Sequence, residues 1–286
     1  MIIDIQNNGI GDVVLACWIL NSTDEKGVFL NPRNNHILPS LFNIPEDRIS
    51  SETSINWSES EGAGHLYEYK NINSAKYSRF ELWMDCLGLK SVPPKKPTFS
   101  EAGNKKDWAN KEWGKVDPSS EKKRVIIFPD AAYRIRTWPI AYYRDVVKYF
   151  LEEGWAVVAM SDKAENLQKL DCHWWYGFPL ENVASMINQS NLVICNDSGP
   201  AHLAGAIGVE TIAICGPTQG QRIYAHDDMI KTACITEEHV PCVGCHFSNS
   251  EGYNPKCVNG CVGLTKYTAS MFIGEIEQSI KKYKAK

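Results

Sequence analysis

Three residues able to hold a phosphorylated ligand stand close together, Asp197, Ser198 and His202. They follow an apolar run at 192–195 and accompany an alanine-rich run that begins after Pro200, where a helix favours proline as its first residue. This order predicts a buried strand, a tight turn and a helix whose first N–H groups face the turn. Such a helix start carries roughly half a positive charge and unpaired donors, which suits a phosphate or diphosphate.

A second small loop follows the same pattern. The apolar run 211–215 is predicted to be the next strand, and Gly216 and Thr218 come directly after it. Ligands of open α/β folds bind at the carboxyl edge of the sheet, so Gly199, Gly216 and Thr218 are candidates for contact with one ligand. On spacing alone, a capped helix explains the turn at 196–199 equally well.

The amino end contains a further candidate, Asp12. An apolar run at 1–6 leads into a loop containing Gly9 and Gly11, and Asp12 falls where a helix over 13–20 is predicted to begin. Glycine allows a close approach of the backbone to a ligand or a neighbouring segment. A carboxylate at a helix start is also favoured by capping, and capping alone accounts for an isolated Asp12.

These motifs together resemble the bacterial heptosyltransferases, the ADP-heptose-dependent glycosyltransferase family 9. The resemblance rests on Asn-Asp-Ser-Gly-x-x-His from position 196, Gly-Pro-Thr at 216–218 and Gly-x-Gly-Asp at 9–12. It implies an α/β protein of the GT-B architecture, with two Rossmann-like domains that face each other across a cleft. The second domain would bind the nucleotide sugar and the first the acceptor.

The resemblance also implies roles for single residues. Asp12 takes the position of the proposed general base, which removes the proton of the acceptor hydroxyl in an inverting transfer. Asp197 and His202 would orient the sugar and the diphosphate. The amides of Ser198 and Gly199 would stabilise the departing diphosphate, and no catalytic divalent ion is then expected.

Two arginines, Arg134 and Arg136, lie in a loop after the predicted strand 124–129. At the carboxyl end of that strand they can reach a diphosphate, although a solvated loop explains either residue alone. Arg136-Thr-Trp-Pro resembles the basic-x-Trp-Pro pattern of the family, in which the basic residue is usually lysine. A guanidinium is a planar fork rather than a point charge, so we expect the geometry of the donor contact to differ.

Four of the ten cysteines have a spacing close to that of a tetrahedral metal site: Cys242, Cys245, Cys257 and Cys261. Four thiolates favour zinc or a single iron, and two disulfides are the alternative. Cys234, His239 and His246 are possible replacement ligands. Heptosyltransferases that modify proteins are similar in carrying an iron held by four cysteines, which implies a structural metal here.

Alternating strands and helices after residue 124 predict a parallel, doubly wound sheet, and 286 residues suffice for two domains. We expect an acceptor-side domain over 1–117 and a nucleotide-sugar-binding domain over 118–267, which includes the cysteine-rich loop 234–261. A terminal helix over 268–286 either crosses back to the first domain or faces solvent.

Charge and hydropathy argue against two classes of function, nonspecific nucleic-acid binding and membrane spanning. A net charge of −4 argues against nonspecific nucleic-acid binding. No apolar run reaches the roughly 20 residues of a membrane helix, and the amino end lacks the basic start of a signal peptide. We therefore expect a cytoplasmic protein with at most peripheral membrane contact.

The expected reaction is transfer of heptose from ADP-heptose to a hydroxyl of the lipopolysaccharide core, a protein serine or a small molecule. The alternatives are a GT-B enzyme that uses another nucleotide sugar and a non-catalytic subunit that binds one.

Overall fold

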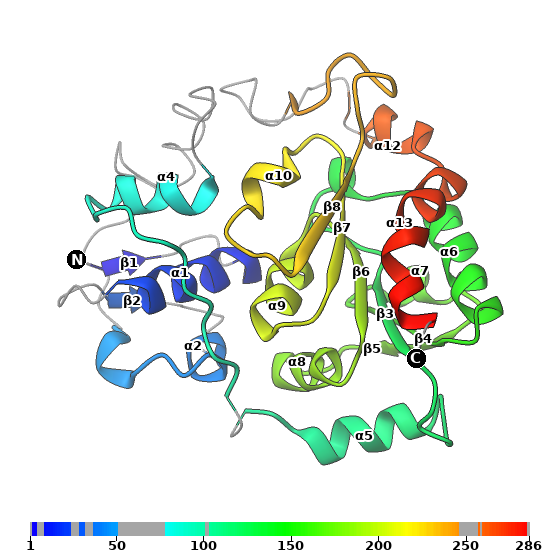
Figure 1. Cartoon of the computed structure of the whole chain (residues 1–286), viewed down its shortest axis with the longest axis horizontal. Coiled ribbons are helices and arrows are strands. Elements are labelled where there is room, and N and C mark those ends of the chain that lie inside the picture. The colour runs from blue at the N-terminus through cyan, green and yellow to red at the C-terminus, as the bar shows by residue number, and fades with distance from the viewer. Residues whose placement is uncertain are drawn as a thin grey trace.

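The computed structural model describes residues 2–4, 9–23, 29–31, 37–50, 78–100, 103–245, 257 and 259–284 (Figure 1). The end of the predicted first strand and the start of the loop after it (5–8) lie outside these residues, as does the whole stretch between Cys245 and Cys257 (246–256).

The carboxyl-terminal half is built on a parallel sheet with the strand order β5-β4-β3-β6-β7-β8. Its strands are β3 (Arg124–Phe128), β4 (Ala156–Ser161), β5 (His173–Tyr176), β6 (Leu192–Asn196), β7 (Thr211–Cys215) and β8 (Ile230–Cys234). Successive side chains of a strand point to opposite faces, so Ile126 and Phe128 belong to one core while Val125 and Ile127 belong to another. The predicted parallel α/β sheet is confirmed.

Helices cover both faces of this sheet, as the buried faces of parallel sheets require. One face is covered by α8 (Leu180–Asn188) and α9 (Gly199–Ile207). The other face is covered by α6 (Ile140–Glu152), α7 (Ala164–Leu167), α12 (Val262–Lys266) and α13 (Ala269–Lys284).

The described part of the amino-terminal half surrounds one helix, α1. Its other elements are β1 (Ile2–Asp4), β2 (Phe29–Asn31), α2 (Ile37–Leu41), the 3-10 turn η2 (Glu46–Arg48) and α4 (Arg79–Cys86), and β1 pairs with β2 in parallel. The helix α1 (Ile10–Ser22) is buried continuously from Gly11 to Leu20. A helix that is apolar all round must be enclosed, and α1 packs directly on α9, so one core joins the two halves.

The helix α5 (Lys106–Gly114) lies before residue 117 in sequence, yet it packs on α8 of the carboxyl-terminal half. The Trp113 indole N–H donates to the Met186 carbonyl at 3.3 Å, and the Lys105 amide donates to the Ser185 hydroxyl at 2.8 Å. These bonds attach the end of the amino-terminal half to the larger sheet.

The last helix, α13, packs on α6 and not on the amino-terminal half (Figure 1). Its stripe of Phe272, Ile276 and Ile280 is buried in the core on the face of the sheet away from α9. Burial of this stripe holds the helix on this face of the sheet; the sequence alone leaves open whether the helix crosses back to the first domain or faces solvent. None of the described helices is long and apolar enough to cross a bilayer.

Candidate active site

The turn between β6 and α9 leaves the start of α9 open to a ligand. Ser198 is the N-cap residue, but its side chain caps no amide and instead donates to the Asn196 carbonyl at 3.1 Å. Ser198 and Gly199 are half-buried, so solvent reaches the first turn of the helix. Capping by the Ser198 side chain therefore does not explain this turn, and a helix start without a side-chain cap is the kind of place where proteins bind anions.

Asn196 fixes the neighbouring loop in place. The side-chain NH2 of Asn196 donates to the Pro129 carbonyl at 2.8 Å, and its side-chain oxygen Oδ1 accepts the Trp138 backbone amide at 2.8 Å. The Trp138 indole in turn donates to the Tyr267 carbonyl at 2.7 Å. The loop that contains the 3-10 turn η3 (Arg134–Arg136) is thus attached to the end of β6 by buried bonds.

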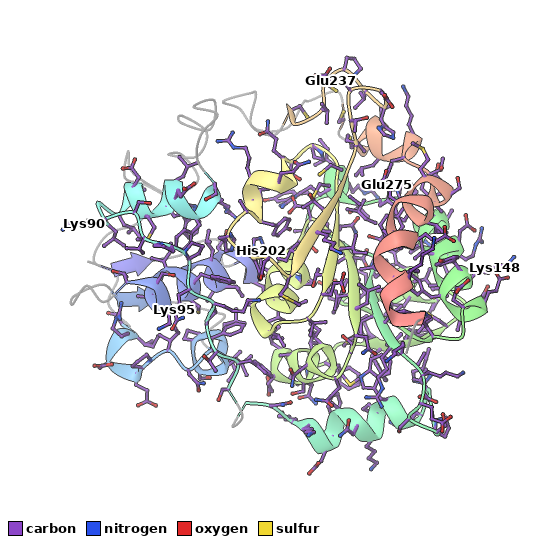
Figure 2. All side chains as sticks on the ribbon, in the orientation of Figure 1. Lys90, Lys95, Lys148, His202, Glu237 and Glu275 are labelled. Atoms are coloured by element: carbon purple, nitrogen blue, oxygen red, sulfur yellow. The ribbon has the colours of Figure 1, made fainter. Side chains whose placement is uncertain are left out.

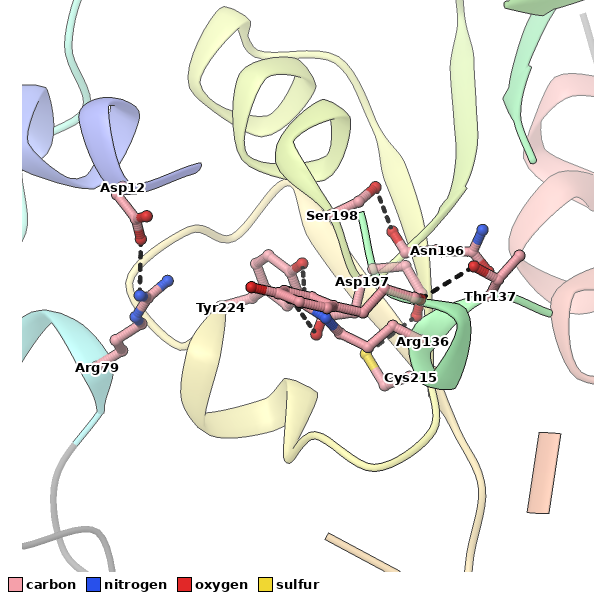
Figure 3. A network of polar contacts seen from close by, with 11 residues as sticks. Asp12, Arg79, Arg136, Thr137, Asn196, Asp197, Ser198, Cys215 and Tyr224 are labelled. Atoms are coloured by element: carbon pink, nitrogen blue, oxygen red, sulfur yellow. Dashed lines mark hydrogen bonds and ion pairs between the residues drawn. The ribbon is translucent and has the colours of Figure 1, made fainter. Parts of the chain in front are cut away.

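Asp197 is a buried carboxylate held from two sides (Figure 3). The Tyr224 hydroxyl donates to one oxygen at 2.5 Å, and the Arg136 guanidinium lies 3.6 Å from the other. Burial favours a raised pKa for Asp197, but the charge of Arg136 and the hydroxyls of Tyr224 and Thr218 outweigh it and lower the pKa. Asp197 is therefore ionised at neutral pH.

Of the other residues predicted to contact the donor, two lie beside Asp197 and two have other surroundings. Thr218 is buried beside Asp197, and Arg136 lies over the ring of Tyr133 with the guanidinium carbon 5.0 Å from its centroid. Arg134, by contrast, is exposed. Gly216 faces α12, because a Cβ there would lie 2.7 Å from Leu264.

His202 lies where α9 meets α1 (Figure 2). Its ring packs on Tyr224 with centroids 4.7 Å apart, and its Nδ1 atom has no hydrogen-bond partner in the described part of the chain. Burial lowers the pKa of His202 to about 4, and the positive charge of Arg79 acts in the same direction. The imidazole is therefore neutral at pH 7.

Two glycines allow the amino-terminal ends of α1 and α9 to meet. A Cβ on Gly11 would lie 2.6 Å from the His202 ring, and a Cβ on Gly199 would lie 2.8 Å from the Cβ of Ile10. Gly9 is the exposed N-cap residue of α1, and its carbonyl accepts the Asp12 amide at 3.0 Å. The glycine motifs at 9–11 and 199 thus serve a single contact between the two halves.

Asp12 does not cap α1. No side chain caps that helix, and the Asp12 carboxylate instead forms an ion pair with Arg79 of α4 at 2.8 Å, with both side chains 13% exposed (Figure 3). Capping is therefore not the role of Asp12. Arg79 begins a helix whose start is fixed by a capping box, in which Ser78 and Glu81 bond each other's amides.

The structure brings most of the predicted residues to one place. The charges of Asp12, Arg79, Asp197 and Arg136 all act on the His202 ring, so groups from α1, α4, η3 and the turn between β6 and α9 lie near it. Arg79 and Tyr224 were not found from the sequence. The Ser-x-x-Glu box at 78–81 predicts a helix start there, but no pattern pairs Arg79 with a residue 67 positions earlier.

A cavity of about 380 Å³ adjoins this cluster. Its walls include Phe80 and Pro93 from the amino-terminal half and His226 from the loop after Tyr224. The rings of Phe80 and His226 are stacked with centroids 5.9 Å apart, and His226 also stacks on His202 at 6.4 Å. Burial and the charge of neighbouring His202 lower the pKa of His226 to about 3.

The predicted four-cysteine metal site is not confirmed. Within the described ranges, no group of three or more His, Cys, Asp or Glu residues is arranged to hold a metal ion. Cys245 and Cys257 do lie close enough to Cys261 to raise its pKa, after the larger effect of burial.

The possible replacement ligands have other surroundings or lie outside the description. Cys234 stands opposite Cys215 in the sheet, and the His239 ring bonds the Thr236 amide at 2.9 Å. His246 lies outside the described residues.

Comparison with known families identifies the chain. Residues 75–251 match the sequence profile of glycosyltransferase family 9 (heptosyltransferase), which is more than half of the 286 residues. The chain belongs to this family. It is therefore a glycosyltransferase, as the motifs at 196–202 and 216–218 predicted; the Asp12 motif lies outside the matched segment. No curated protein matches the chain in sequence.

Solved structures confirm the GT-B fold of this family 9 transferase. A family 9 glycosyltransferase from Veillonella parvula has a TM-score of 0.68 at 14% identity, with 98% of this chain and 96% of that chain covered. ADP-heptose lps heptosyltransferase II of E. coli has a TM-score of 0.61 at 15% identity, with 99% of each chain covered. TibC, an iron-containing dodecameric glycosyltransferase of enterotoxigenic E. coli, has a TM-score of 0.68 at 11% identity, with 99% of this chain and 76% of that chain covered.

Proposed function

We propose that this transferase moves a heptose from ADP-heptose to an acceptor hydroxyl with inversion at the sugar carbon. The observation that carries the proposal is the ionised, buried Asp197, held by Arg136 and Tyr224 beside the uncapped start of α9. The donor named for the E. coli relative, ADP-heptose, contains both a diphosphate and a polyhydroxylated sugar. Amides and a guanidinium suit the diphosphate, and a carboxylate suits the sugar hydroxyls.

Each half of the site has one part in this reaction. The acceptor oxygen forms a bond to the anomeric carbon, the bond from that carbon to the diphosphate breaks, and ADP leaves with the electron pair. The proton of the acceptor hydroxyl passes to Asp12 on α1, whose carboxylate is oriented by Arg79. The α9 amides and Arg136 stabilise the charge that develops on the diphosphate.

Donor identity is tested by titrating the purified protein with ADP-heptose, UDP-GlcNAc and GDP-mannose in separate calorimetric experiments. We expect binding of ADP-heptose and ADP, and release of ADP when an acceptor is present. Binding of only a uridine or guanosine nucleotide sugar would assign the protein to another donor class. Binding of ADP-heptose without turnover of any acceptor would indicate a non-catalytic subunit.

In this proposal the acceptor binds to the amino-terminal domain, and the boundary between the two domains lies at residues 117–118. The helix α5, which precedes that boundary, packs on α8 of the second domain. Lipopolysaccharide core, a serine-containing protein and a small polyol are the three acceptor classes to supply with ADP-heptose. The acceptor class whose mass increases by one heptose is the substrate. We propose that the reaction takes place in the cytoplasm.

We also propose a structural zinc or iron at Cys242, Cys245, Cys257 and Cys261. The support is their spacing, the proximity of three of these thiols, and the iron reported in the name of TibC. Elemental analysis of the purified protein should give about one metal per chain, and Cys242→Ser should lower that content. Cys172→Ser is the matched control, and an unchanged metal content in both variants would remove the proposed site.

A further inference from the structure

Cys215 and Cys234 form a pair that the proposed reaction does not use. They are direct register partners at the carboxyl ends of the adjacent parallel strands β7 and β8. Neighbouring strands lie about 4.8 Å apart, and a disulfide spans Cα separations of about 4.4–6.8 Å. Neither cysteine is in a disulfide, the Cys215 thiol donates a hydrogen bond to the Ala213 carbonyl at 3.6 Å, and each of the two cysteines shifts the pKa of the other.

The surroundings make Cys234 the more reactive of the two. The pKa of Cys234 is lowered, chiefly by its contact with Cys215 and further by the Thr232 side chain and the Gly220 amide, whereas the pKa of buried Cys215 is raised. Cys234 is half-buried on β8, the edge strand of the sheet, whereas Cys215 is fully buried. A thiol with a lowered pKa and access to solvent beside an enclosed thiol is the arrangement of an attacking and a resolving cysteine.

This pair adjoins the donor side of the site. Cys215 directly precedes the loop that contains Thr218, and the Asp197 charge acts on both thiols. A Cβ on Gly220 would lie 2.5 Å from the Cys215 sulfur, so the loop and the short helix α10 (Gly220–Ile223) rest directly on this thiol. Figure 3 shows Cys215 together with Asp197, Arg136 and Tyr224.

We propose that Cys215 and Cys234 are a redox-reversible modification site, which a peroxide converts to a disulfide that weakens donor binding. The Cys234 thiolate attacks one peroxide oxygen, the O–O bond breaks, and water leaves after protonation, which gives a sulfenic acid. The Cys215 thiol then attacks the sulfenic sulfur, the S–O bond breaks, and a second water leaves. Two thiols are oxidised and one peroxide is reduced, and a small thiol reductant reverses the change.

Disulfide formation is tested on the full chain by treatment with hydrogen peroxide, non-reducing proteolysis and mass spectrometry. We expect a linked peptide that joins Cys215 to Cys234, lighter than the sum of its parts by about 2 Da and lost on addition of dithiothreitol. Cys234→Ser, which keeps the shape of the side chain, should abolish the link. Cys172→Ser should retain it, because Cys172 is also half-buried but burial raises its pKa to about 12.

The effect on the donor rests on the proposed function and is measured separately, as the Kd for ADP of the reduced and oxidised protein. We expect the oxidised form to bind about tenfold more weakly, the effect of one lost hydrogen bond to a charged group. A protein in which peroxide leaves the two cysteines unlinked overturns the proposal, and a linked protein with unchanged ADP affinity overturns its regulatory part. Failure of the reduced protein to bind ADP would instead overturn the proposed function.

Discussion

The proposed active site has a donor side around Asp197 and an acceptor side around Asp12, and these two sides are built in different ways. The donor side consists of residues close together in sequence, since Asn196, Asp197 and Ser198 are consecutive and their partners lie in neighbouring loops fixed by buried hydrogen bonds. The acceptor side joins Asp12 to Arg79 through a single ion pair between two helices. Because the donor-side contacts come from η3 and the loops after β6 and β7, whereas Asp12 and Arg79 lie on α1 and α4, we expect mutations to separate donor binding from catalysis.

The sharpest separation is expected from Asp12→Asn. The amide cannot accept the acceptor proton, so kcat should fall by about 10²- to 10⁴-fold. The Kd for ADP should not change, because the proposed donor contacts lie on η3, on the turn between β6 and α9, and on α9 itself. Asp47→Asn, an exposed change on η2, is the control and should leave both quantities unaltered. An Asp12→Asn variant with full turnover would exclude Asp12 as the base.

The converse change is Arg136→Ala, which acts on the donor side. Removal of the guanidinium takes away a diphosphate contact and the charge beside buried Asp197, so ADP should bind roughly 10- to 100-fold more weakly. Arg134→Ala is a matched control in the same turn, and because Arg134 is exposed its effect should be below about twofold. If ADP affinity fell equally in the two variants, contact with Asp197 would not distinguish the arginine that binds the donor from the one that does not.

Sequence reasoning found the donor side more completely than the acceptor side, for a physical reason. A strand that ends in a turn and a helix forms from consecutive residues, so the candidates Asp197, Ser198 and His202 could be read from one segment. Arg79 reaches Asp12 only after α4 packs near α1, and Tyr224 reaches Asp197 only after β7 and its following loop are in place. Such pairings arise from tertiary packing, so no characteristic spacing in the sequence predicts them.

The interface between the two sides can be tested with a single methyl group. Gly11→Ala places a Cβ 2.6 Å from the His202 ring, and because this ring is buried the free energy of unfolding should fall by about 1–3 kcal/mol. Gly114→Ala at the end of α5 is the control, since a Cβ there meets nothing within 4 Å and should be neutral or stabilising. Urea unfolding of both variants gives the comparison, and equal stabilities would contradict the close contact of α1 with α9.

The smallest effect concerns pH, because His202 and His226 are buried where the two sides meet. An unfolded histidine titrates near 6.5, whereas the folded pKa values are lowered to about 4 and about 3 by burial. The unfolded state therefore binds more protons in this interval, so the contribution to stability is complete above pH 6.5 and is lost as the pH falls toward 4. Each group should cost about 1.4 kcal/mol between pH 7.5 and pH 5.5.

The variant His226→Phe measures the contribution of His226 to the pH dependence of the free energy of unfolding. Phenylalanine can keep the stacking on Phe80 and cannot be protonated, so the variant should lose about 1.4 kcal/mol less than the wild type when urea unfolding is compared at the two pH values. His173→Gln, an exposed change on the edge strand β5, is the control for replacement of a histidine outside this junction. If His226→Phe instead lost as much stability as the wild type, His226 would not contribute to the pH dependence, and His202 would be left as the buried histidine at this junction that can account for it.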